Sequence, residues 1–106
     1  MHLVLEITAI IIFMEFLLTE FRLHAVQRMF ERGITVLDVK EVIKTGKIIE
    51  NYPEDKPFQS YLLLGFVKGK PVHVVTAIDN ETKKAIIITV YEPDPKLWQV
   101  GFERRK

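Results

Sequence analysis

The chain has 106 residues, of which 48% are hydrophobic, and this length and composition suit one domain with one core. Lys and Arg total 15 against 14 for Asp and Glu, so the formal net charge of +1 excludes a bulk attraction to nucleic acid and leaves only a local basic patch. The chain has no cysteine, which excludes disulfides, thiolate metal sites and cysteine nucleophiles, and suits a reducing, cytoplasmic compartment.

The apolar N-terminal segment looks like a membrane span, but its charges argue against one. Glu6 and Glu15 flank its longest uncharged run, which is eight residues long, whereas a transmembrane helix needs about 20. We therefore predict no membrane span and treat residues 1–20 as an extension. Three interpretations stay open: a helix buried against a partner, an interfacial anchor, and a misplaced translation start. We favour the last, with Met14 as the true first residue, because regular globular patterning begins only after it.

Residues 21–106 are predicted to form a single α+β domain that begins with two helices. The first is expected over residues 20–32 and ends at Gly33, a residue type that readily adopts the left-handed conformation of a helix C-cap. Thr35, followed three residues later by Asp38, predicts a capping box that opens a second helix over residues 36–45. Both helices have one apolar stripe and need a sheet to cover.

The sequence after the second helix predicts this sheet. Alternating and apolar runs bounded by glycine, proline and polar residues indicate four strands. The strands are expected over residues 47–52, 61–67, 72–79 and 85–91. Short turns at 68–70 and 80–83 connect the last three strands as hairpins. The predicted fold is thus two N-terminal helices packed on a four-stranded antiparallel meander, with an extra apolar N-terminal segment.

One helix face carries residues suited to phosphate chemistry. At about 100° per residue, His24, Arg28 and Arg32 lie nearly above one another. Imidazole titrates near neutral pH and can move a proton, whereas guanidinium stays charged. The competing interpretation is a solvated face on which the arginines pair with Glu31 or Glu20.

A second group of candidates lies near the end of the last strand. Thr89 and Tyr91 share one face and offer hydroxyl groups to an anion or a base. Whether His73 joins them depends on the hairpin register. A four-residue turn places His73 opposite Val90, on the other face, and a three- or five-residue turn reverses this. The sequence leaves the register open.

Other residues give weaker signals. The tail containing Arg104 and Arg105 is the densest basic cluster, and it is open between a substrate contact and a solvated, frayed terminus. Trp98 and Tyr52 are predicted to be packing residues, because no aromatic ladder accompanies them. The three histidines lack metal-ligand spacing, so no metal or other cofactor is predicted.

Several short motifs in a fixed order resemble a known family. They include HAVQRMFERGI at 24–34, GKIIE at 46–50, PVHVV at 71–75 and TVYEPDPKLW at 89–98. Together they are similar to a prokaryotic family of domains of unknown function related to the RelE/barnase-like toxins, and the resemblance covers about residues 23–105. The family pattern maps onto His24, Arg28, Arg32, Gly33, His73, Thr89, Tyr91, Pro93 and Trp98.

The resemblance implies a RelE/barnase-like fold and a toxin-antitoxin function. The implied chemistry is metal-independent cleavage of single-stranded RNA, in which the 2′-OH attacks the adjacent phosphate. RNA and a cognate antitoxin would be the partners. The candidate catalytic residues are His24, Arg28, His73 and Tyr91, and the candidate substrate-binding residues are Arg32, Thr89, Arg104 and Arg105. This assignment needs His24 to lie near Tyr91.

Two other functions compete with the ribonuclease. Isoleucine runs at 10–12 and 86–88 fit a non-catalytic protein-interaction or homo-oligomerisation module. Gly33 between two helices is similar to a helix-turn-helix of a DNA-binding regulator. Acidic residues on the second helix weaken that hypothesis, because Asp38 and Glu41 offset Lys40 and Lys44.

Overall fold

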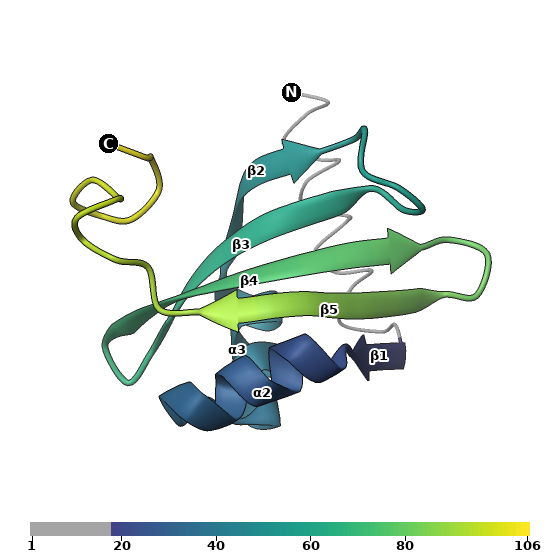
Figure 1. The fold of residues 1–106 in the computed structure, drawn as a ribbon, viewed down its shortest axis with the longest axis horizontal. Coiled ribbons are helices and arrows are strands. Elements are labelled where there is room, and N and C mark those ends of the chain that lie inside the picture. The colour runs from purple at the N-terminus through teal and green to yellow at the C-terminus, as the bar shows by residue number, and fades with distance from the viewer. Residues whose placement is uncertain (1–17) are drawn as a thin grey trace.

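A twisted sheet of five strands, covered on one face by two helices, forms the framework of the protein (Figure 1). The structure is a computed structural model that describes residues 18–106. In chain order the elements are β1 (Leu18–Phe21), α2 (Leu23–Arg32), α3 (Val36–Thr45), β2 (Lys47–Tyr52), β3 (Ser60–Val67), β4 (Lys70–Asp79) and β5 (Lys84–Tyr91). The three interpretations of the predicted extension, residues 1–20, fall largely on residues 1–17, which lie outside the described residues; residues 18–20 belong to β1.

The sheet is mixed, with strand order β1-β5-β4-β3-β2. Strands β2 to β5 form the predicted antiparallel meander, and their bounds match the predicted ones to within two residues. The prediction of only four antiparallel strands is wrong, because β1 pairs in parallel with β5, from Leu18 beside Lys84 to Phe21 beside Ile87. Four residues are too few to show an alternating pattern, and the free edge of β5 supplies the pairing.

The strand also moves the start of the first helix. Helix α2 begins at Leu23 rather than at Glu20, because Glu20 and Phe21 belong to β1. Arg22 follows in an extended conformation, and its backbone N–H donates to the carbonyl of Ile87 at 3.0 Å. The predicted end is confirmed, since Gly33 caps α2 with a φ of 68°.

Helix α3 has the predicted bounds and the predicted cap. The hydroxyl of Thr35 accepts a hydrogen bond from the backbone N–H of Asp38 at 3.1 Å. The carboxylate of Asp38 accepts one in return from the backbone N–H of Thr35 at 2.9 Å. This reciprocal capping box fixes where the helix starts.

Both helices pack on the same face of the sheet, α2 on β5 and α3 on β3. The core between them is apolar and consists of Ala25, Met29, Val39, Val42, Ile43, Tyr61, Leu63, Val72, Val74, Ile78, Ala85, Ile87 and Val90. Close packing at the centre depends on Gly65, since a Cβ atom there would lie 2.9 Å from both methyl groups of Val42. No helix in the described part is long and apolar enough to cross a membrane.

The opposite face of the sheet carries no helix. Two irregular segments lie on it: the loop of residues 53–59, and residues 92–106, which we call the C-terminal arm. In Figure 1 the arm is the yellow segment that continues from the end of β5. The arm contacts the sheet through the buried side chain of Trp98, which is 3% exposed. This helix-free face is where the polar candidate residues of the strands meet.

Candidate functional site

A β-bulge in β5 decides which candidate residues share the helix-free face. The turn between β4 and β5 has four residues, and the register runs from Asp79 beside Lys84 to Thr76 beside Ile87. Ile88 is then an extra residue in β5, so that Val75 pairs with Thr89. Each residue of β5 after Ile88 therefore lies on the face of the sheet opposite to the one it would occupy in a regular strand.

As a result, His73 lies directly opposite Tyr91. The expectation that a four-residue turn places His73 opposite Val90 is wrong, because the bulge supplies the extra residue that a five-residue turn would have supplied. His73, Thr89 and Tyr91 therefore share one face. Thr89 is half-buried beside the pair.

His73 is fully buried, and both of its ring nitrogens have a partner. Its Nε2 lies 2.9 Å from the carbonyl oxygen of Phe102, which can only accept, so Nε2 carries the proton. Its Nδ1 therefore accepts from the hydroxyl of Tyr91, at 3.2 Å. Burial lowers the pKa of His73, although the bond to Phe102 acts in the opposite direction. The neutral ring links β5 to the C-terminal arm.

The arm is folded back on itself around Trp98. The rings of Trp98 and His73 form a T-shaped pair with centroids 4.5 Å apart, and the guanidinium of Arg105 lies 4.6 Å from the Trp98 ring centre. Backbone hydrogen bonds also hold the tail, including one from Lys106 to Leu97 at 2.9 Å. The structure thus favours a packed tail over a frayed one, and confirms Trp98 as a packing residue.

Strand β2 contributes the acidic part of the site. A carboxylate oxygen of Glu50 lies 3.4 Å from Nε of Arg105, and the other accepts a hydrogen bond from the Tyr52 hydroxyl at 2.6 Å. Burial, together with the hydrogen bond to Glu50, raises the pKa of Tyr52 to about 12. An ion pair between Lys47 and Glu103 also joins the arm to β2.

These residues form one connected group, which we call the arm cluster: Glu50, Tyr52, His73, Tyr91, Trp98 and Arg105. Burial acts to lower the pKa of Arg105, but its hydrogen bond to Tyr52 and the charge of Glu50 outweigh burial and raise it. Burial raises the pKa of Tyr91. At neutral pH the cluster therefore holds a charged guanidinium, two protonated phenols and a neutral imidazole.

Sequence reasoning missed Glu50. A signal was available, because Glu50 is the single acidic residue in the predicted strand of residues 47–52. Its pairing with Arg105 could not be predicted, because Arg105 lies 55 positions later in an arm without regular structure. Arg104 is exposed next to Arg105, and its carbonyl accepts from the backbone N–H of Gln99 at 2.8 Å.

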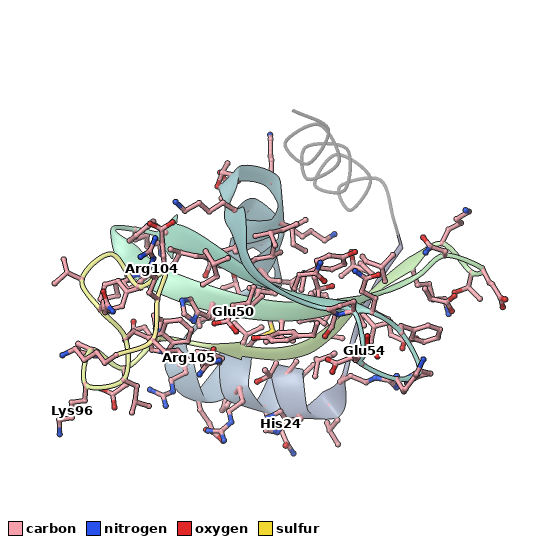
Figure 2. All side chains as sticks on the ribbon, turned by 90° about the horizontal axis from the view of Figure 1, so that it is seen from above. His24, Glu50, Glu54, Lys96, Arg104 and Arg105 are labelled. Carbon is pink, nitrogen blue, oxygen red and sulfur yellow. The ribbon has the colours of Figure 1, made fainter. Side chains whose placement is uncertain are left out.

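The polar stripe of α2 lies elsewhere. His24, Arg28 and Arg32 are exposed, while Ala25 and Met29 of the same helix are buried in the core. Figure 2 shows His24 on the outer side of α2, pointing away from the sheet, whereas Glu50, Arg104 and Arg105 lie near one another beside the arm. The structure therefore does not bring the stripe to Tyr91.

The surroundings of the stripe match the competing interpretation. Arg28 lies 3.9 Å from Glu31, as expected for a solvated helix face. Within residues 18–106, no group of three or more His, Asp or Glu side chains is arranged to hold a metal ion.

The family model for a domain of unknown function (DUF4258) matches residues 21–92. The chain belongs to the DUF4258 family. The DUF4258 match includes both helices and the strands that supply Glu50, Tyr52, His73 and Tyr91, and it ends before Trp98 and Arg105. Comparison with curated proteins and with solved structures found no significant match. The relation of this DUF4258 domain to the RelE/barnase-like toxins stays a prediction.

Proposed function

We propose that this DUF4258 domain is a cytoplasmic, metal-independent endoribonuclease of the toxin-antitoxin type that cleaves single-stranded RNA. The observation that carries the proposal is the arm cluster, in which a carboxylate, a guanidinium and two phenols meet on the helix-free face of the sheet. Cleavage by the 2′-OH needs a base, a cation beside the phosphate and an acid for the leaving oxygen. The cluster contains all three.

Glu50, Arg105 and Tyr91 would divide this work. Glu50 takes the proton of the 2′-OH, whose oxygen forms a bond to the phosphorus. Arg105 stabilises the negative charge that develops on the phosphoryl oxygens. The bond from phosphorus to the 5′-oxygen breaks, and the Tyr91 hydroxyl turns from Nδ1 of His73 to give its proton to that oxygen. Solvent then returns a proton from Glu50 to Tyr91, so the enzyme ends as it began, with a 2′,3′-cyclic phosphate as product.

The other candidates take supporting roles in this proposal. His73 is a positioning residue, because it is fully buried and its Nδ1 accepts from the Tyr91 hydroxyl. Thr89, half-buried on the same face, and the exposed Arg104 would bind substrate. The proposal moves the chemistry away from the stripe of His24, Arg28 and Arg32, and it keeps RNA and a cognate antitoxin as the proposed partners.

A cleavage assay with single-stranded RNA and excess chelator tests the proposal. The parent should produce 2′,3′-cyclic phosphate ends, and a 2′-deoxy substitution at the cleaved nucleotide should block the reaction. Glu50→Gln and Tyr91→Phe should each lower the rate by about 10²-fold or more. Glu54→Gln, the same change at an exposed loop position, is the matched control. Equal rates for Glu50→Gln and the control would refute the assignment.

One observation favours a second function, the protein-interaction or homo-oligomerisation module. Five large apolar side chains on the helices are exposed, and the most exposed of them are Leu23 at 72%, Phe30 at 88% and Leu37 at 76%. Under this hypothesis the parent self-associates in solution, and Phe30→Ser restores a monomer. A monomeric parent that cleaves RNA would exclude the module in favour of the enzyme.

A further inference from the structure

A pocket lies on the helix-free face between the loop of residues 53–59 and the strands β4 and β5. Its volume is about 230 Å³. Ala77, Ile86 and Ile88 form an apolar floor, and Pro57 and Phe58 of the loop form a wall. Pockets for drug-sized ligands start near 300 Å³, so this one suits a single flat ring system. Phe58 offers a side chain of the kind on which RNA bases stack.

The rim of this loop pocket is polar and mostly cationic. Arg22 and Lys56 supply two positive charges, and Asp55 supplies a carboxylate. Arg22 is exposed and lies 3.9 Å from Glu20, a surface pairing of a kind that is worth little and is readily exchanged for a phosphate. Lys56 has no acidic partner within ion-pair distance among the residues that the structure describes.

Asp55 gives the pocket a means of reading a base. One of its oxygens accepts a hydrogen bond from the hydroxyl of Ser60, which holds the side chain in place. The other oxygen has no hydrogen-bond partner within residues 18–106. A carboxylate can only accept hydrogen bonds. It therefore favours a base edge that presents an exocyclic amino group, such as that of cytosine, over the edge of uracil, whose one N3–H donor lies between two carbonyl oxygens that repel the carboxylate.

The loop pocket and the arm cluster lie along one strand. Ala77 of the pocket floor and His73 of the cluster are four residues apart on β4 and face the same side. At about 3.3 Å per residue their separation is roughly 13 Å. A mononucleotide is too short to occupy both places, and an oligonucleotide of a few residues can reach from one to the other across Val75 and Thr89, which are half-buried.

We propose that the loop pocket binds one base of single-stranded RNA and selects for an exocyclic amino group through Asp55, with Arg22 and Lys56 contacting the flanking phosphates. The proposal rests on the proposed function, because RNA is the substrate there, and it adds a specificity site at a distance from the reacting phosphate. It predicts a preference for cytosine over uracil at one position near the cleavage site.

The probes that test this proposal are cytidine 3′-monophosphate and uridine 3′-monophosphate. They have nearly equal size and differ only at one base edge, where cytidine has an amino group and an unprotonated N3 and uridine has a carbonyl oxygen and an N3–H. Neither contains a bond to cleave, so binding is measured independently of catalysis. Backbone amide NMR signals of Phe58, Ala77 and Ile88 should shift with the cytidine nucleotide, which should bind about tenfold more tightly than the uridine nucleotide. Asp55→Asn should abolish this difference, and Glu54→Gln, its neighbour outside the pocket, should keep it.

A second variant covers the case in which Asp55→Asn disturbs the loop by weakening the bond to Ser60. Ile88→Trp fills the pocket without changing Asp55, and it should remove the shifts of Phe58 and Ala77. Equal binding of the two nucleotides by the parent, or the absence of shifts at the pocket, would overturn the proposal. Such a result together with RNA cleavage by the arm cluster would leave the proposed function standing. Selective nucleotide binding without cleavage would refute the proposed function alone.

Discussion

Acid should destabilise the protein through His73, and the substitution His73→Phe should remove much of this dependence. Burial holds the pKa of His73 below its ordinary value of 6.5 in the folded state. The unfolded chain therefore binds the proton more readily. The stability that this difference contributes is fully present above pH 6.5, and it is lost as the pH falls below 6.5 toward the lowered pKa.

The magnitude follows from one proton. Within that pH window, each unit of pH costs up to about 1.4 kcal/mol of unfolding free energy. For a domain of this size the corresponding drop in Tm is roughly 5–10 °C per unit. His73→Phe keeps a ring in contact with Trp98 but leaves the Tyr91 hydroxyl and the Phe102 carbonyl without their partner. It should cost about 1–3 kcal/mol at pH 7.5 and flatten the dependence below pH 6.5.

Urea unfolding between pH 5 and pH 8 measures this effect. Trp98 is the single tryptophan and it touches His73, so its fluorescence reports on this region. Glu50 and Arg105 also face the imidazole, and their opposite charges act on its pKa in opposite directions. His24→Gln changes an exposed histidine and should keep the parental slope. A His73→Phe protein with the parental slope would refute the reasoning.

Three further predictions concern other contacts. Gly65→Ala should cost about 1–3 kcal/mol in urea unfolding, because its Cβ would lie 2.9 Å from the methyl groups of Val42; an unchanged midpoint would contradict this packing. Thr35→Ala should cost about 1 kcal/mol in the same assay through loss of the capping box, and no loss would show that the box does not stabilise α3. Glu50→Gln should lower the pKa of Tyr52 from about 12, seen as phenolate absorbance at lower pH, whereas an unchanged titration would place Tyr52 away from Glu50.

Much of the fold was predictable because its signals are local. The capping box of Thr35 and Asp38, the C-cap at Gly33 and the alternating strands each depend on a few adjacent residues. Strand β1 was not predictable, because its four residues carry no periodic signal and its pairing depends on the distant edge of β5. Local patterns predict elements, and contacts made across the sheet determine which of the short segments join it.

The candidate site was harder to predict than the fold, because it depends almost entirely on contacts between residues that are distant in the sequence. The pairing of His73 with Tyr91 depends on a bulge at Ile88, and no glycine or proline in the sequence marks it. The i, i+4 spacing correctly placed His24 and Arg28 on one exposed face of the helix. Spacing alone does not show whether that face points toward the residues of the sheet or away from them. The link between Glu50 and Arg105 joins a strand to an irregular arm, and neither residue indicates the other in the sequence.

The most direct test of the central claim, that the chemistry belongs to the arm cluster, compares Arg105→Ala with His24→Ala in cleavage of single-stranded RNA with excess chelator. Arg105 lies 3.4 Å from Glu50, while His24 points away from the sheet. We predict that Arg105→Ala loses about 10²-fold or more in rate and that His24→Ala cleaves like the parent. Loss of cleavage in His24→Ala with full activity in Arg105→Ala, or no cleavage by the parent, would contradict the claim.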